Sequence, residues 1–227
     1  MNKSTRFLLK LVVFCGNKVV GKVSRLTILR WVVWSMENRQ ISIRFFFDRE
    51  KFVTAMQILC RRTDNLDMLK AVKLLYFIDR EHLRTYGRPV LGDYYVAMPL
   101  GPVPSQSYDA LKMVQAGEAS DIPLTSKDVG RRYPVFDATK DPDFSYLSKS
   151  ELRSVENVIK QFGDKSGTEL SDIAHKHQTW KKSKPDPNTP PSRIDYTSFF
   201  AEEPDACKNA YEAMLLEQEE RDFAGGI

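Results

Sequence analysis

The strongest helical pattern in the chain lies between Leu66 and Tyr86. Its apolar side chains recur at the three- and four-residue spacing of a helix, at Met68, Leu69, Val72, Leu75, Tyr76 and Ile78. Leu74 and Phe77 widen this apolar stripe beyond what a surface helix needs. We therefore predict a central helix over about residues 66–86 that is covered on several sides. Gly87 should end it, with Arg84 near its negative C-terminal end.

A second helix is predicted just before the central one. Apolar residues at positions 41, 43, 45 and 47 alternate with Ser42, Arg44 and Phe46, which indicates a short strand or an extended lead-in. Asp48 then has the position of an N-cap for a helix over about residues 49–62. Residues 63–65 should break this helix before the central one begins.

The sequence GPVP, at residues 101–104, follows the central helix. Gly101 favours a turn, Pro102 has a fixed φ, and Pro104 disfavours the helical conformation at Val103. Pro104 suits the first position of a helix and Gly117 suits its exit, so a helix is expected between them. The block is either a recognition turn that is rigid before a partner arrives or a helix-entry turn needed for packing, and the pattern leaves both open.

The rest of the chain shows weak sequence signals for strands and stronger ones for helices. Residues 89–100 predict one or two short strands, and residues 131–136 predict another that would complete a small sheet. Ser148 with Glu151, and Ser166 with Glu169, have the spacing of capping boxes and predict two short helices. Residues 181–191 read as a loop, and residues 204–223 as a last helix with an acidic end.

These elements predict a mainly α fold, a compact multi-helix domain around the helix at about 66–86, with a small β element at about 90–100 and 131–136. The expected organisation is a basic, apolar extension over 1–40, the helical domain over 41–200, and an acidic helix and tail over 201–227.

Charge is divided unevenly along the chain. The 227 residues carry 34 Lys and Arg against 30 Asp and Glu, a formal net charge of +4. Residues 1–36 contain seven basic and no acidic residues, so the remainder has 27 basic against 30 acidic ones. This slightly acidic body weighs against nucleic acid as a partner. Cys15, Cys60 and Cys207 form neither a zinc spacing nor a disulfide framework, which favours a reducing cytoplasm.

The first 35 residues allow several interpretations. Lys10 interrupts the apolar centre and no small-residue cleavage site follows, which disfavours a secretory signal. No run approaches the roughly 20 apolar residues of a spanning helix. The segment could lie on a membrane surface, pack on the body, or precede a true start at Met36, and we favour the last. A membrane partner is expected only if this segment is present and surface-bound.

Candidate chemistry is sparse. Asp79 and His82 share a helix face, so Asp79 either orients the imidazole for base or metal chemistry or, as we favour, forms a structural pair with it. His175 and His177 would point about 200° apart on a helix, which disfavours a shared metal. No Ser/His/Asp, phosphate-loop or HExxH signature is present. We expect no enzyme activity, no catalytic residue, no metal and no cofactor.

Three long stretches resemble a known family. They are KLLYFIDREHLRTYGRPVLGD, YVAMPLGPVPSQSYDAL and LSKSELRSVENVIKQFGDKSGTELSDIAH, with Trp180 shortly after. They resemble the Panacea domain, the SocA-like antitoxin domain also found in phage-associated GepA-like proteins, over roughly residues 45–200. Positions that match its pattern are Tyr76, Asp79, His82, Gly87, Gly101, Pro102, Val103, Glu169, Leu170, His175 and Trp180. Tyr94, Tyr95 and Tyr108 lie near the GPV block. They are either binding residues or core residues whose hydroxyl groups reach solvent.

The resemblance implies a cytoplasmic antitoxin that binds a cognate protein toxin and performs no chemistry. Its SocA branch implies an alternative, an adaptor that delivers the toxin to a ClpXP protease. A third hypothesis is a DNA-binding repressor of its own operon, which the acidic body and the lack of a helix-turn-helix pattern disfavour.

Overall fold

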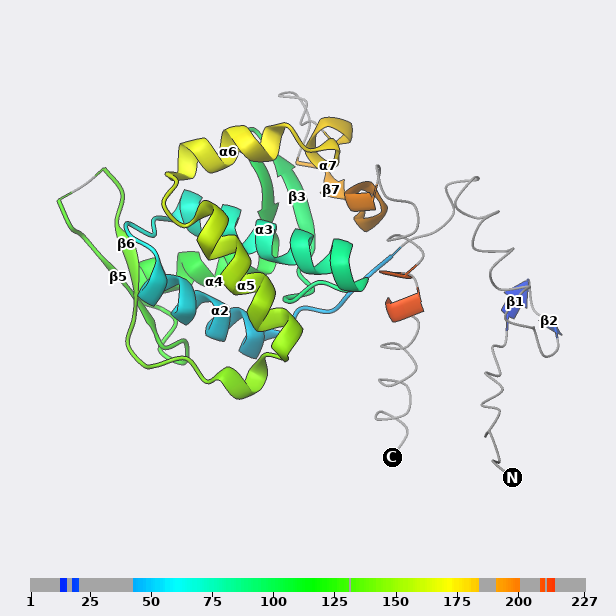
Figure 1. Cartoon of the computed structure of the whole chain (residues 1–227), viewed down its shortest axis with the longest axis horizontal. Helices are drawn as coiled ribbons and strands as arrows, with labels where there is room; N and C mark the ends of the chain where they lie inside the picture. Colours follow the sequence, from blue (N-terminus) through cyan, green and yellow to red (C-terminus); the bar gives the residue numbers. More distant parts are fainter. Residues whose placement is uncertain are drawn as a thin grey trace. The chain divides into compact units, whose positions relative to one another are not determined.

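The computed structural model (Figure 1) describes residues 13–15, 18–20, 43–130, 132–183, 191–200, 209–210 and 212–214. The chain divides into two compact units, Met1–Ile41 and Ser42–Ile227. In the first unit, β1 (Val13–Cys15) pairs antiparallel with β2 (Lys18–Val20). The helices that the structure describes belong to the second unit.

The predicted central helix is confirmed as α3 (Met68–Tyr86). Asp67 caps it by accepting a hydrogen bond from the Lys70 N–H, and Gly87 ends it in the left-handed conformation at φ +77°. Leu74 and Leu75 are both 0% exposed. Because α3 carries apolar side chains on several sides, other helices cover it, and α2, α4, α5 and α6 all pack against it (Figure 1).

Four other predicted helices are present in the part of the chain that the structure describes. Asp48 caps α2 (Arg49–Arg62), and α4 (Ser105–Ala116) ends at Gly117. Both capping boxes form, one at the start of α5 (Lys149–Phe162) and one at the start of α6 (Gly167–His175). Three short elements were not predicted: α7 (Gln178–Lys182), η1 (Phe144–Tyr146) and η2 (Tyr196–Phe200).

The mainly α class with a small β element is confirmed, but the strands differ in detail from the prediction. β3 (Tyr95–Met98) lies between β4 (Gly101–Pro104) and β7 (Arg193–Ile194) in an antiparallel sheet. GPVP is therefore a strand, and the prediction of a turn there was wrong. Its prolines are tolerated because β4 is an edge strand, which needs N–H donors on one side only.

The second predicted strand region belongs to a separate hairpin. β6 (Val135–Ala138) pairs with β5 (Leu124–Lys127), which the sequence pattern did not reveal. Residues 43–48 are extended without forming a strand. Most of the loop over 181–191, of the extension over 1–40 and of the helix predicted over 204–223 lies outside the described residues. None of the helices that the structure describes has the length and apolarity needed to span a membrane.

Candidate functional site

A groove of about 460 Å³ lies between the first half of α3 and the β3–β4 hairpin. It is lined mainly by apolar side chains, those of Met68, Leu69, Val72, Met98, Pro99, Leu100 and Val103, together with Asp67, Lys73, Tyr108 and Tyr133. Leu100 and Tyr133 are 56% and 54% exposed. A concave apolar surface with few polar groups is typical of a binding site.

Lys73 is the unusual residue of this groove. It is 0% exposed, and its Nζ donates a 2.7 Å hydrogen bond to the carbonyl oxygen of Pro102. Burial lowers the pKa of Lys73 to about 7, because the charged amine has lost its water. Lys73 was not among the residues predicted from the sequence, although a lysine inside the apolar stripe of the central helix is a visible signal.

Gly101 makes room for Lys73. Its φ of +102° is a conformation that residues with a side chain rarely adopt. A Cβ at this position would lie 3.0 Å from Lys73 Nζ and 3.5 Å from the Ala174 Cβ. The predicted importance of Gly101 therefore has a physical basis in both its backbone conformation and its contacts.

Three helices fix the carbonyl groups of the β3–β4 hairpin. The Trp180 Nε1–H of α7 donates to the Met98 carbonyl at 3.0 Å, and the Ser171 hydroxyl of α6 donates to the Leu100 carbonyl at 2.7 Å. Lys73 of α3 holds the Pro102 carbonyl. The hairpin that presents Leu100 is thus fastened from three sides, so little conformational entropy remains to be lost when a partner binds.

The candidate tyrosines are distributed between core and surface. Tyr76 and Tyr95 are 0% and 1% exposed and belong to the core. Tyr108 is half-buried and lines the groove. Tyr94 is half-buried outside the groove lining, with the Arg193 guanidinium 5.0 Å from its ring centroid. The groove therefore brings together Val103 and Tyr108 from the candidate set, with Gly101 and Pro102 in contact with its lysine.

Asp79 and His82 fasten α3 to the loop after it. Asp79 accepts hydrogen bonds from the Val90 and Leu91 N–H groups at 2.9 and 2.7 Å, and from the Tyr95 hydroxyl at 2.9 Å. Burial outweighs these bonds and raises the pKa of Asp79 to about 7.

His82 makes its own connections. Its Nδ1 lies 2.6 Å from the Arg88 carbonyl oxygen and its Nε2 lies 3.2 Å from the Ser150 hydroxyl. The two side chains of the candidate pair thus bind different groups rather than each other. This arrangement accords with an architectural role for both.

The two candidate histidines of the second half face different surroundings. The His175 ring lies 4.1 Å from the Trp180 ring, centroid to centroid, whereas His177 Nδ1 lies 2.9 Å from the Tyr76 hydroxyl. Within the described ranges, no three His, Cys, Asp or Glu side chains are grouped so as to hold a metal ion.

Sequence reasoning also missed Asp93, which organises the start of α4. Its carboxylate is buried and accepts hydrogen bonds from the Gln106 N–H at 3.0 Å, and from the Ser107 N–H and hydroxyl at 2.7 Å each. Asp93 thus binds the first free N–H groups of α4, because the side chain of Pro104, at the N-cap position, cannot accept hydrogen bonds from them. A cap supplied from this far along the chain leaves no local sequence signal.

The fold and the groove define a mainly α domain with a small β element and a rigid, largely apolar surface beside its hairpin. Residues 72–181, from within α3 to within α7, match the model of the family described as "Antitoxin SocA-like, Panacea domain". The chain therefore contains a Panacea domain, as the resemblance predicted. No curated protein and no solved structure matches the chain.

Proposed function

We propose that this protein is a cytoplasmic antitoxin that neutralises a cognate protein toxin by binding it in the groove beside the β3–β4 hairpin. The match of residues 72–181 to the SocA-like antitoxin family supports the antitoxin role. The observation that carries the choice of surface is the largely apolar lining of the groove, in which Leu100 and Tyr133 are 56% and 54% exposed. Neutralisation by binding requires no chemical step from the chain.

The chemistry of the groove defines what the toxin must present. An apolar segment would cover Leu100 and Tyr133, whose exposed side chains gain from leaving water. Lys73 is fully buried, so it contributes indirectly: its hydrogen bond to the Pro102 carbonyl holds the hairpin that presents Leu100 to the partner.

Co-expression tests this proposal. The product of the neighbouring open reading frame would be expressed in a bacterial host with the wild-type chain or with Leu100→Asp, in strains with and without ClpXP. We expect the wild type to restore growth in both strains while the toxin stays abundant, and Leu100→Asp to fail because it places a charge in the apolar contact. Phe144→Asp is the matched control, since Phe144 is 53% exposed and lies outside the groove.

Three outcomes would contradict the proposal. Failure of the wild type to restore growth would remove the antitoxin role for that toxin. Equal loss of rescue in Leu100→Asp and Phe144→Asp would remove the groove as the binding surface. Toxin loss that depends on ClpXP would replace neutralisation by delivery to the protease.

A further inference from the structure

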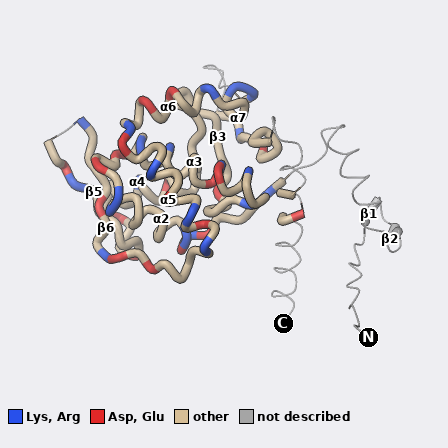
Figure 2. Tube along the Cα trace, viewed as in Figure 1, with Lys and Arg blue, Asp and Glu red and all other residues tan. Residues whose placement is uncertain are grey.

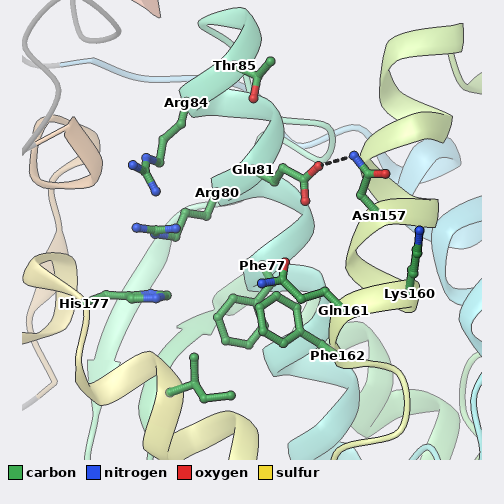
Figure 3. A pocket seen from close by; sticks show the side chains of 11 residues that line it. Phe77, Arg80, Glu81, Arg84, Thr85, Asn157, Lys160, Gln161, Phe162 and His177 are labelled. Atoms are coloured by element: carbon green, nitrogen blue, oxygen red, sulfur yellow. Dashed lines mark hydrogen bonds between the residues drawn. The ribbon is translucent and has the colours of Figure 1, made fainter.

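A second cavity, of about 880 Å³, opens along the other half of α3, where α5 and α6 pack against it (Figure 3). It shares no lining residue with the groove beside the hairpin. Arg80 and Arg84, one turn apart on α3, line it and point to the same side as His177, and Lys160 of α5 lies on the opposite side (Figure 3). Glu81 is the one acidic residue among the described lining residues, so the cavity is cationic.

Arg80 indicates that an acceptor belongs in this cavity. Its Nε is buried and has no hydrogen-bond partner among the described residues. A buried guanidinium N–H without a partner is costly. An anion held beside Arg80 would accept from this N–H and remove that cost. Guanidinium groups match phosphate especially well, because their N–H groups donate in parallel pairs.

His177 adds a neutral donor to this cationic side. Burial and the charges of Arg80, Arg84 and Lys181 lower the pKa of His177 to about 4, so the ring is neutral near pH 7. Burial raises the pKa of Tyr76 to about 12, so its phenol keeps its proton and can donate to His177 Nδ1 at 2.9 Å. In that arrangement Nε2 carries the ring proton. Basic residues of α7, Lys181 and Lys182, add positive charge to this end of the domain (Figure 2).

The remaining lining offers an aromatic surface and a carboxylate. The Phe162 ring is stacked on Phe77, with centroids 4.5 Å apart and planes 20° apart, and it is half-buried. Asn157 Nδ2 donates to Glu81 Oε1 at 2.8 Å, which fixes the carboxylate and leaves its second oxygen as an acceptor for hydroxyl groups (Figure 3).

We propose that this cavity binds a nucleotide, with its phosphates on Arg80 and Arg84, its base against Phe162 and its sugar hydroxyls on Glu81. The volume falls within the range of roughly 300–1,000 Å³ found for small-molecule sites. An acidic peptide would use the cationic side alone, and Glu81 would repel it. A nucleotide uses the cationic, aromatic and carboxylate groups together.

The test is calorimetric titration of the full chain with AMP, ADP, GDP and GTP, and with inorganic phosphate alone. We expect saturable binding of at least one nucleotide, at least tenfold tighter than that of phosphate. Arg84→Gln should weaken the nucleotide at least tenfold, because one charge-assisted hydrogen bond to phosphate is lost. Arg153→Gln is the control, since Arg153 is an exposed basic residue of α5 outside the cavity lining.

Asn157→Ala gives a second test that does not depend on an arginine variant. Asn157 is exposed, so its truncation should leave the fold intact. It removes the hydrogen bond that fixes Glu81, so the affinity for the nucleotide should fall severalfold while the affinity for phosphate stays unchanged. The absence of nucleotide binding at millimolar concentration, equal affinity for phosphate and nucleotides, or unchanged affinity in Arg84→Gln would each overturn the proposal. Leu100→Asp should bind the nucleotide normally, so this inference and the antitoxin proposal can fail separately.

Discussion

Among single residues, Lys73 shows how a side chain that opposes folding can occupy the centre of a domain. Its amine is fully buried and binds one carbonyl oxygen, whereas its neighbours in the helix, Val72 and Leu74, are buried apolar residues. A methionine of similar length would suit this position better as far as folding alone is concerned. Under the proposed function, Lys73 lowers stability but fixes the hairpin that binds the toxin, through its bond to the Pro102 carbonyl.

Lys73→Met tests this interpretation. The pKa of Lys73 is about 7 in the folded chain against 10.5 for an exposed lysine, so the unfolded state binds more protons between these values. The unfolding free energy of the wild type should therefore rise between pH 7 and pH 10.5. Below pH 7 the full cost of burying the charged Lys73 is present. We expect Lys73→Met to be more stable by roughly 1–3 kcal/mol at pH 6, with a smaller difference at pH 9, in urea unfolding. A variant that is less stable at pH 6 would contradict this account.

Gly101→Ala tests the close approach of backbone and lysine. The alanine would adopt a strained φ of +102° and bring its Cβ to 3.0 Å from Lys73 Nζ, so we expect a loss of roughly 1–3 kcal/mol in unfolding free energy. Gly117→Ala is the matched control, because Gly117 also has a positive φ, of +75°, but no atom lies within 4 Å of the added carbon. Equal losses in the two variants would show that contact with Lys73 is unimportant.

Individual residues were predictable where their partners lie close in sequence. Asp48 and Gly87 act within one turn of the helices they cap or end, and both were predicted from the sequence. Lys73 and Asp93 bind groups 29 and 13 to 14 residues away, and nothing local marks those partners. The groove could therefore be located only in part from the sequence.

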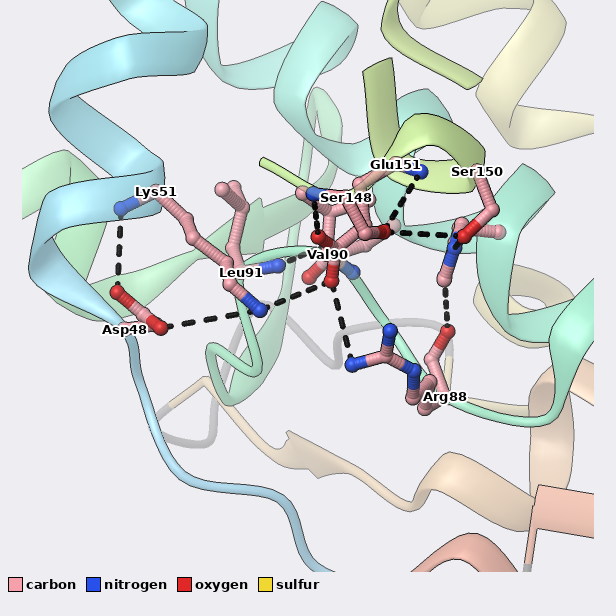
Figure 4. Close-up of polar contacts among 10 residues, drawn as sticks. Asp48, Lys51, Arg88, Val90, Leu91, Ser148, Ser150 and Glu151 are labelled. Carbon is pink, nitrogen blue, oxygen red and sulfur yellow. Dashed lines mark hydrogen bonds and ion pairs between the residues drawn. The ribbon is translucent and has the colours of Figure 1, made fainter. Parts of the chain in front are cut away.

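Among the elements, the start of α5 connects α2 with the loop after α3. Glu151 has a side chain that is 1% exposed, and it accepts hydrogen bonds from Lys51 at 2.8 Å and from the Ser148 N–H at 2.7 Å (Figure 4). Arg88 forms an ion pair with the same carboxylate at 3.3 Å. A capping box, usually a local device, thus joins three segments of the chain.

Glu151→Gln should weaken this connection in a pH-dependent way. Burial by itself raises the pKa of Glu151, but the hydrogen bonds from Lys51 and Ser148 outweigh it and leave the pKa below its usual value. A lowered pKa of an acid means that its stabilisation is present above pH 4.5 and is lost as the pH falls below that value. We expect Glu151→Gln to lower the unfolding free energy by roughly 1–3 kcal/mol at pH 7, and by less at pH 3.5.

The second capping box provides the control for this prediction. Glu169 occupies the same position in α6, but it is exposed to solvent. Glu169→Gln should change stability at pH 7 much less than Glu151→Gln, as measured by the same unfolding experiment. Similar changes in both variants would show that the ion pairs of Glu151 add nothing to its role as a cap.

The elements that the sequence predicted well are those with a strong helical period. The strands were harder, because β4 contains two prolines, which disfavour a strand in general, and β5 has the unremarkable sequence LTSK. β4 is extended because it pairs with β3, and β5 because it pairs with β6. Such partners cannot be identified from the sequence of a short segment alone.

At the scale of the whole domain, α3 connects the two candidate binding regions. Its first half lines the groove beside the hairpin and its second half lines the cationic cavity. The helical core could be predicted because burial of α3 follows from its own apolar pattern. The groove and the cavity could not, since their linings combine residues from segments far apart in the sequence.

Leu75→Ala tests the central position of α3. Leu75 is 0% exposed, so its truncation should leave a cavity and lower the unfolding free energy by roughly 2–5 kcal/mol. Leu100→Ala is the control, because Leu100 is 56% exposed and should change stability little. A Leu75→Ala variant as stable as the wild type in urea unfolding would show that α3 is not the centre of the core.

The position of β4 at the sheet edge affects how copies of this protein behave at high concentration. Pro102 and Pro104 have no N–H group, and both residues direct their backbone polar groups to the same side of the strand. That side faces away from β3, because the Pro102 carbonyl binds Lys73 instead. The edge offers no donor at either proline, and all four residues of β4 are buried, so an incoming strand cannot pair there and one route to self-association and fibril growth is closed.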